Sequence, residues 1–140
     1  MITPALSPPS GATWLLDRRD ISSRDVWGAT GVSLKQGSRY FFRASGTWWD
    51  AWISCDANGY NRAYMNRFKD GLRCKLEGAT WFTLIGSIGQ SDRVLFVIGD
   101  GSRVQEGWVA PEDGPLCAFA NDKQRWYWNN LSFITLEVWQ

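Results

Sequence analysis

Short apolar runs of strand length, each closed by turn residues, constrain the fold of this chain more than any other feature. The clearest pair is Trp81–Ile88 and Arg93–Ile98, which the turn sequence Gly89-Gln-Ser-Asp92 separates. Runs of about four to eight β-branched and aromatic residues between Gly, Asn, Asp or Ser are typical of strands joined as hairpins. The pattern predicts antiparallel β-structure in the middle of the chain.

Similar runs recur along the rest of the sequence. In the last of them Ile134, Leu136 and Val138 share one face, and Thr135 and Glu137 take the other. About eight short strands with turn signals at this spacing predict an all-β fold, an antiparallel β-sandwich that is jelly-roll-like. The further runs are Ala12–Leu16, Val26–Val32, Tyr40–Ser45, Trp108–Ala110, Leu116–Ala120 and Ser132–Trp139.

The chain has 140 residues, which is the length of one domain. We expect a flexible leader over residues 1–12, which are rich in Pro and Ser, and a single domain over residues 13–140. Residues 53 to about 78 show no sustained periodicity and are expected to form a long loop with one short helix at most. Loops of that length in a compact domain are usually functional or mobile.

Tryptophan is the compositional outlier. The chain carries ten of them, and aromatic residues make up 15% of the sequence. With 14 glycines and few helix-favouring runs, this composition favours strands and turns. Rings of this size dominate burial energetics, so most are expected in the core and about two or three facing a ligand.

Histidine is absent, which excludes Ser-His and Cys-His nucleophiles and the commonest zinc sites. An enzyme built on this chain would have to use carboxylates. The net charge is only +1, and Asp70 and Glu77 interleave with the basic residues between 62 and 75. We interpret that run as a solvated loop and expect no nucleic-acid partner, because such a partner needs a clustered basic face.

The three cysteines, at positions 55, 74 and 117, have neither zinc-ligand nor Cys-x-x-Cys spacing. Cys117 lies in a strand pattern and is expected to be buried. Cys55 and Cys74 flank the long loop, where they could either form a disulfide or remain reduced. The first residues lack the features of a signal peptide, and no apolar run approaches transmembrane length. We expect a soluble protein made in the cytoplasm, without membrane insertion, and leave release by an unconventional route open.

The segment Asn121-Asp-Lys-Gln-Arg-Trp-Tyr-Trp-Asn-Asn130 combines oxygen donors with aromatic rings. Asp122, Asn129 and Asn130 supply hard oxygen ligands, of which Ca²⁺ needs about six to eight. Trp126 and Trp128 offer apolar faces on which a sugar ring can stack. The alternative role of the Asp and Asn residues is turn formation, since their side chains bond their own backbone. Metal ligands beside aromatic rings suggest carbohydrate binding more than catalysis.

The order of strands and loops resembles the bacterial PA-IL-type calcium-dependent galactose-binding lectins, from about Trp27 to the C-terminus. The similarity is strongest over residues 116–138, where strand, Asn-Asp, six intervening residues, Asn-Asn and strand follow one another. The segment Ala44-Ser-Gly-Thr-Trp-Trp-Asp50 is similar to a family segment that ends in a calcium-contacting carbonyl. The resemblance implies a lectin-like, galactose-binding-domain-like β-sandwich.

The resemblance also implies a function: non-catalytic, calcium-dependent binding of a galactose-like sugar or glycoconjugate. In such lectins two sugar hydroxyls complete the coordination shell of one Ca²⁺, and the Asp and the first Asn also bond the sugar. Transferred to this chain, Asp122 and Asn129 would contact both the metal and the sugar. The full set of metal ligands would be the Asp122 carboxylate, the side-chain oxygens of Asn129 and Asn130, and the backbone carbonyls of Asp50 and Trp126.

The chain departs from the family pattern beside the metal. Trp128 stands where these lectins usually carry Gly, and Trp126 stands where the best known of them has Thr. Because the two residues are i and i+2 on a tight loop, we expect at least one ring to be exposed beside the metal and to stack on the sugar. The family also uses a His to contact the sugar, and this chain has none.

Three functions are therefore open. The first is the lectin, with a homo-oligomer as the expected assembly. The second is an assembly module of the same fold, with calcium structural or absent. The third is a glycosidase that uses only carboxylates, for which Asp50 and Asp122 are the pair expected to converge.

Overall fold

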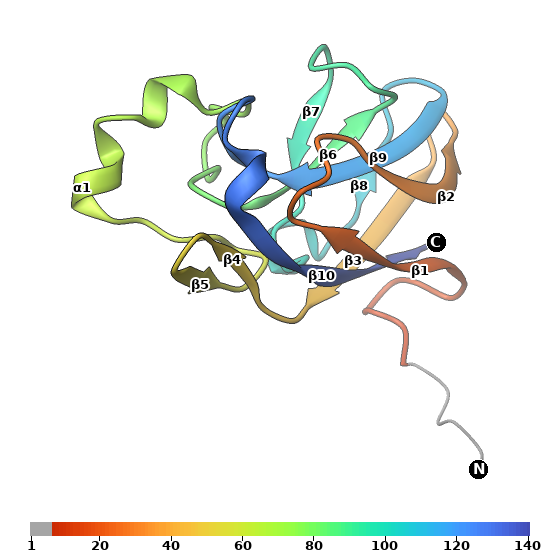
Figure 1. The fold of residues 1–140 in the computed structure, drawn as a ribbon. Helices are drawn as coiled ribbons and strands as arrows, with labels where there is room; N and C mark the ends of the chain where they lie inside the picture. The colour runs from red at the N-terminus through yellow and green to blue at the C-terminus, as the bar shows by residue number, and fades with distance from the viewer. Residues whose placement is uncertain (1–6) are drawn as a thin grey trace.

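The computed structural model describes residues 7–140, and these form two antiparallel sheets packed face to face (Figure 1). The first sheet has six strands in the order β5-β4-β10-β3-β8, with β1 also paired to β10. The second sheet has four strands in the order β2-β9-β6-β7. The predicted all-β, antiparallel β-sandwich is confirmed, and the described residues form ten strands where about eight were expected.

The strand boundaries place the long strand β10 at the centre of the first sheet. That sheet contains β1 (Leu15–Ser22), β3 (Arg39–Ser45), β4 (Trp48–Asp50), β5 (Ile53–Cys55), β8 (Trp108–Val109) and β10 (Asn130–Trp139). The second sheet contains β2 (Gly28–Leu34), β6 (Leu84–Ile88), β7 (Leu95–Val97) and β9 (Gly114–Ala120). The short helices are α1 (Ala63–Asn66) and the 3₁₀ helices η1 (Lys69–Gly71), η2 (Ser102–Val104) and η3 (Tyr127–Asn129).

The largest differences from the sequence prediction lie in β1 and around the long loop. The predicted run ended at Leu16, because all four residues from Asp17 to Asp20 are charged. In the structure, β1 continues to Ser22. Most of these side chains are exposed, as an edge strand allows. The predicted loop from residue 53 to about 78 contains α1 as its short helix, but it begins with strand β5.

The core lies between the two sheets, and β10 contributes to it as predicted. Ile134, Leu136 and Val138 are all buried, on the face of β10 that meets the second sheet. Trp48 is fully buried, with its ring in edge contact with Phe82 at 5.7 Å between centroids. At the other extreme, Trp14, Trp52 and Trp128 expose 71%, 76% and 75% of their surface, so these rings are not part of the core.

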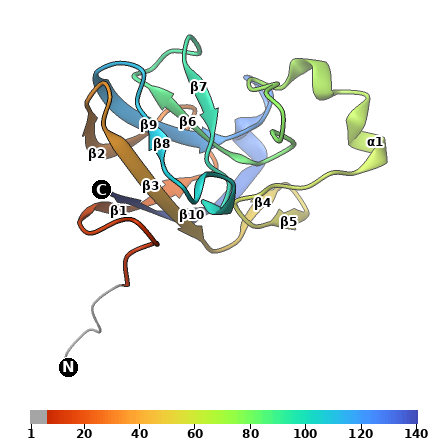
Figure 2. The same ribbon diagram turned by 180° about the vertical axis from the view of Figure 1, so that it is seen from behind.

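Strand pairing gathers several loops at one end of the sandwich. β3 and β4 follow one another along the same side of β10 in one register, and β1 lies along the other side. The last residue of β4, Asp50, therefore lies opposite the first residue of β10, Asn130. The loop that carries α1 stands out from the body at the end where β4 and β5 lie, as the view from behind also shows (Figure 2).

The chain before β1 packs against the C-terminus. Thr13 and Trp14 both donate their backbone N–H to the carbonyl of Gln140, over 2.8 Å in each case. The predicted leader over residues 1–12 lies in part outside the described residues, which begin at residue 7. All three cysteines are free thiols, and Cys117 is buried as expected. Within residues 7–140, no helix is long and apolar enough to cross a membrane.

Gly59 offers a test of how tightly this end of the sandwich is packed. Its φ is +80°, and a Cβ there would lie 2.2 Å from the carbonyl oxygen of Trp81. We expect Gly59→Ala to lower the free energy of unfolding by about 3 kcal/mol or more, because left-handed strain and overlap with backbone add. Gly37 has a φ of +83° with nothing within 4 Å, so Gly37→Ala should cost only about 1–2 kcal/mol. Urea denaturation measures both, and equal losses would contradict this account of the packing.

Candidate functional site

Three segments that are distant in the sequence meet where β4 ends and β10 begins. Asp50 closes β4, Asn130 opens β10 opposite it, and Asp122 lies in the loop between β9 and η3. The amide nitrogen Nδ2 of Asn130 donates to Oδ2 of Asp122 over 3.0 Å. The structure thus brings three of the five predicted metal ligands together around Asn130.

The Asn130 side chain has only one possible orientation. Its Nδ2 donates to the carbonyl oxygen of Ser23 over 2.9 Å as well as to Asp122. Both partners can only accept while Asp122 is ionised, so the nitrogen must face them and the oxygen must face the other way. That oxygen, Oδ1, is buried and has no hydrogen-bond donor among the described residues.

Asn129 presents a second acceptor of the same kind. Its Oδ1 is also buried and without a donor in the described part of the chain. Asn129 lines a cavity of about 170 Å³ together with Asp50 and Trp126, which are both predicted ligands. A buried polar atom left unpaired costs about 1–3 kcal/mol. Adjacent residues of this loop thus carry two buried oxygens that are free to accept from or coordinate a ligand.

The carboxylates of the site are buried. Asp122 has no exposed surface, and burial raises its pKa to about 7, with the nearby Asp50 carboxylate adding to the rise and the bond from Asn130 opposing it. Burial also raises the pKa of Asp50, which the hydroxyl of Tyr60 opposes by donating to Asp50 Oδ2 over 2.5 Å. Burial of ionised carboxylates is costly, so a proton or a cation at this site would stabilise them.

The donor set fits a hard cation. No group of three or more His, Cys, Asp and Glu side chains lies together within residues 7–140, so a thiolate or imidazole metal centre is not formed there. The set instead combines the Asp122 carboxylate with two amide oxygens, and Ca²⁺ takes such ligands together with backbone carbonyls. The side chains of Asp122, Asn129 and Asn130 would hold the ion, and Asp50 and Trp126, the predicted carbonyl ligands, line the same cavity as Asn129.

The two tryptophans of the loop have different environments. The Trp126 ring is half-buried and stacks on Trp81 at 5.9 Å and 13° between planes, while Lys123 Nζ lies 4.3 Å from its centroid. Trp128 lies inside η3 without a positive φ, and its side chain is exposed. One ring of the pair is therefore exposed, as predicted, and its role toward a sugar stays a prediction.

The predicted sugar contacts are not equally accessible. Trp128 is exposed and Asn129 and Trp126 are half-buried, so all three have surface that a ligand can touch. Asp122 has none. Within this conformation, Asp122 can act on a sugar only through the cation that it would hold.

Sequence reasoning missed two residues of the site. Tyr60 lies ten residues beyond Asp50 and bonds its carboxylate, and nothing in the sequence pattern of the loop marks that contact. Trp52 lies in the turn between β4 and β5 and lines the same cavity as Asp50 and Asn129. The only available signal for Trp52 was a large aromatic residue in a segment with turn character, because the turn itself was not predicted.

Arg73 corrects the interpretation of the basic run as a solvated loop. Its side chain is only 2% exposed, and the guanidinium lies 3.5 Å from the ring centroid of Phe119. It donates to the carbonyl of Val26 over 2.7 Å and to the hydroxyl of Tyr127 over 2.8 Å. Aromatic faces and hydrogen bonds replace water around this cation, which is why an arginine can be buried here.

Asn121 also has a structural role that its neighbours do not share. Its amide accepts from the N–H of Cys74 and donates to the carbonyls of Cys74 and Thr80, over 2.9 to 3.0 Å. All of its polar atoms are thereby used. Asn121 thus connects the start of the loop after β9 to the segment from Cys74 to Thr80. No polar atom of its side chain remains for a ligand.

Comparisons with known proteins show the fold. No protein-family profile matches the sequence, and no curated protein matches it significantly. Among solved structures, the chain is similar to one described as "EclA N-terminal domain; PllA-like lectin", with a TM-score of 0.65 and 20% sequence identity. The match covers 89% of this chain and 96% of that chain, so the similarity of fold extends over most of both chains.

The pKa of Asp122 predicts how stability changes with pH in the absence of a cation. Because its pKa is about 7 in the folded state and about 4 in an unfolded chain, the folded state keeps a proton that the unfolded chain loses. The stabilisation is complete below about pH 4 and is lost as the pH rises through about 7, and Asp50 acts in the same direction. In EDTA, we expect the melting temperature to fall between about pH 4 and pH 7 and to level off above that range.

Asp122→Asn should remove a large part of that fall, since the amide does not titrate. Asp25→Asn, at an exposed position, is the matched control and should keep the wild-type profile. Thermal denaturation across the pH range measures this. The same profile in all three proteins would contradict the assignment to Asp122.

Proposed function

We propose that this protein is a non-catalytic, calcium-dependent carbohydrate-binding module. The observation that carries the proposal is the pair of buried, unpartnered oxygens on Asn129 and Asn130, next to the buried carboxylate of Asp122. The shared fold with a PllA-like lectin domain supports carbohydrate binding in general. Calcium dependence rests on the donor set of this chain.

Each residue of the site has a distinct task in this proposal. Asp122 supplies a negative charge, and the Oδ1 atoms of Asn129 and Asn130 supply neutral oxygens in orientations fixed by the fold. The Asp50 and Trp126 carbonyls extend the set. A bound calcium ion would leave coordination positions open to two neighbouring hydroxyls of a sugar. Burial of the protein ligands keeps water from competing for the ion on the inner side.

The sugar side of the site is open to solvent and aromatic. Trp128 exposes 75% of its surface next to Asn129, so its indole can stack on the apolar face of a ring held at the ion. Galactose-like sugars are the first class to test, because the resemblance of the 116–138 segment to the PA-IL-type lectins implies them.

The state of the carboxylates supports binding over glycoside hydrolysis. A glycosidase needs an acid that reaches the glycosidic oxygen and a second carboxylate on the other side of the bond. Asp122 has no exposed surface, and its two oxygens accept N–H bonds from Lys123 and Asn130. Asp122 is therefore not presented to a substrate, and the Asp50 carboxylate is engaged by the Tyr60 hydroxyl.

An assembly module is the second candidate, and one surface favours it. Trp49 and Leu131 are partners across β4 and β10 and expose 41% and 51% of their surface, and Phe133 exposes 47% in the same strand. Such a strip fits a contact between copies of this chain. We propose a homo-oligomer through this strip, which light scattering in solution would test. It is compatible with the lectin, so sugar binding decides between the two.

Calcium should stabilise the folded protein, because an ion that binds only the folded state shifts unfolding by mass action. We expect about one ion per chain by calorimetric titration, and a melting temperature that rises by several degrees in millimolar Ca²⁺ and falls again in EDTA.

Asp122→Ala should abolish both calcium effects, since it removes the one ligand with a formal charge. Gln124→Ala changes an exposed residue of the same loop and should leave both unchanged. Normal calcium binding in Asp122→Ala would contradict the ligand set.

Sugar binding itself is tested on a glycan array probed once with Ca²⁺ and once with EDTA. We expect binding to galactose-terminated glycans that disappears in EDTA. Binding that survives EDTA would remove calcium from the proposal. An array without any signal, from a protein that still forms oligomers, would favour the assembly module.

A further inference from the structure

Three aromatic rings stack in sequence beside the candidate cation site. The Tyr60 and Trp81 rings lie 6.5 Å apart between centroids with 16° between their planes, and those of Trp81 and Trp126 lie 5.9 Å apart at 13°. Trp81, the middle ring, is fully buried, and the two outer rings are half-buried. This aromatic stack joins three separate loops, which follow β5, precede β6 and follow β9.

Each end of the aromatic stack reaches a residue of the site. The Tyr60 hydroxyl donates to Oδ2 of Asp50 over 2.5 Å, and Trp126 is itself one of the predicted carbonyl ligands. Asp50 and Trp126 line the same cavity as Asn129. The stack therefore connects the two residues whose backbone carbonyls are expected to face the ion.

The two ends differ in how firmly the backbone holds them. Asp50 is paired with Ile53 and with Asn130 in the first sheet, so strand pairing fixes its position. Trp126 lies outside the strands, just before η3, and its backbone N–H bonds the nearby carbonyl of Lys123 over 3.0 Å. The position of the Trp126 carbonyl therefore depends on what holds the Trp126 ring.

Three side chains contact the Trp126 ring. Trp81 stacks on it, Phe68 meets it edge-on at 5.5 Å and 66°, and Lys123 Nζ lies 4.3 Å from its centroid. Trp81 is fully buried, whereas Phe68 and Lys123 are half-buried. Stacked aromatic pairs stabilise each other beyond the area that they bury. Trp81 is therefore the most rigid of the three contacts.

Hydrogen bonding does not explain why an indole stands at position 81. The Trp81 nitrogen Nε1 is buried and has no hydrogen-bond partner within residues 7–140. An unpaired buried donor is costly, and a purely apolar side chain would avoid that cost. What the indole offers at this position is a large flat ring that stacks with both Tyr60 and Trp126.

We propose that Trp81 is a positioning residue of the cation site: its stacked ring holds Trp126, and thereby the Trp126 carbonyl, where the ion binds. Tyr60 anchors the same stack to Asp50. This inference rests on the proposed function, and it assigns a role to two residues outside the ligand set. Residues behind the ligands of a metal site typically change its affinity about 10- to 100-fold when they are replaced.

The test compares replacements of Trp81 that keep or remove a flat ring. Calcium is titrated calorimetrically into the full chain carrying Trp81→Leu or Trp81→Phe. We expect Trp81→Leu to weaken calcium binding about tenfold or more, and Trp81→Phe to stay within about threefold of wild type. Tyr60→Phe keeps the stack but removes the bond to Asp50, so its affinity should lie between those of the two Trp81 variants. It leaves no cavity, so it decides the matter if Trp81→Leu does not fold.

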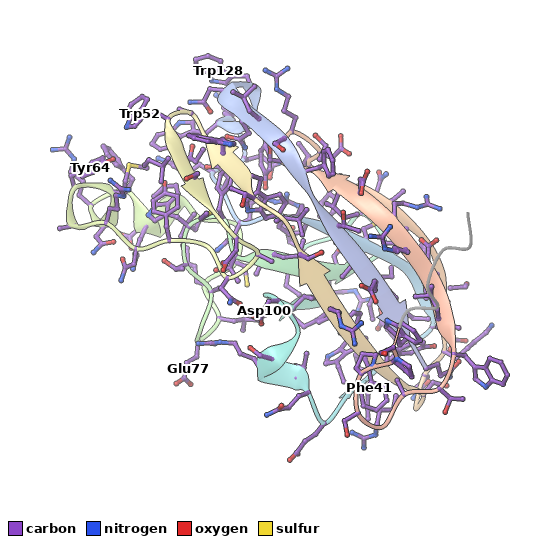
Figure 3. All side chains as sticks on the ribbon, turned by 90° about the horizontal axis from the view of Figure 1, so that it is seen from below. Phe41, Trp52, Tyr64, Glu77, Asp100 and Trp128 are labelled. Carbon is purple, nitrogen blue, oxygen red and sulfur yellow. The ribbon has the colours of Figure 1, made fainter. Side chains whose placement is uncertain are left out.

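Phe41→Leu is the matched control. Phe41 is buried, and Figure 3 shows it at the opposite end of the molecule from Trp52, which lines the cavity of the site. The substitution lowers stability without reaching the aromatic stack. Calcium affinity should therefore stay within about twofold of wild type, because distant substitutions act independently.

A measurement without metal reports on the stack itself. Trp81 and Trp126 are the one stacked pair of tryptophans within residues 7–140. Stacked indoles couple their electronic transitions and give a pair of opposite bands in circular dichroism. In EDTA, wild type, Tyr60→Phe and Phe41→Leu should show this pair, and Trp81→Leu should lose it. Melting temperatures in EDTA report on the fold of each variant.

The outcomes separate this inference from the proposed function. Unchanged calcium affinity in Trp81→Leu, with wild type binding the ion, overturns the positioning role and leaves the calcium-dependent module standing. An equal loss of affinity in Phe41→Leu would overturn it as well, because lowered stability alone would then explain the effect. So would the absence of the paired bands from wild type, since the rings would not stack in solution. If wild type binds no calcium, the proposed function fails and the positioning role fails with it.

Discussion

The rest of the site depends on the side-chain amide of Asn130. Its nitrogen joins the loop after β1, through Ser23, to the loop after β9, through Asp122, and both bonds are buried. Those two bonds leave the Asn130 oxygen no choice of direction, and strand pairing holds Asp50 opposite. The nitrogen of this amide makes two hydrogen bonds, and its oxygen makes none within the described residues. The direction of that oxygen sets the geometry of the candidate cation site. The neighbouring oxygen of Asn129 extends it.

The buried guanidinium of Arg73 supports the loop that carries these ligands. Arg73 packs against Phe119 and bonds the hydroxyl of Tyr127, which in turn donates to the carbonyl of Ala120 over 2.6 Å. Tyr127 lies in η3, between the two tryptophans. Because this contact is buried, the loop can keep Asn129 and Asn130 in place without a ligand. Binding of the proposed ion would then require little ordering of the loop, which would favour affinity.

The sandwich and the loop with Asp122, Asn129 and Asn130 could be predicted from the sequence, because both depend on local patterns of apolar and turn residues. The sequence placed Asp50 at the site through the family resemblance, and the β4–β10 register agrees with that position. Tyr60 and Trp52 were beyond reach, because their contacts depend on how the long loop and the β4–β5 turn fold back. Arg73 was misjudged for a related reason: a charged residue in a polar run is usually solvated, and only tertiary packing shows the aromatic faces around it.

The central claim is that the oxygens of Asn129 and Asn130 face a bound calcium ion. A high-resolution crystal structure of the protein grown with Ca²⁺ tests it most directly. The account predicts an ion at about 2.3–2.6 Å from Oδ1 of Asn129, from Oδ1 of Asn130 and from the Asp122 carboxylate. Crystals grown in saturating calcium that show no ion at these three side chains, or an ion held elsewhere, would contradict it.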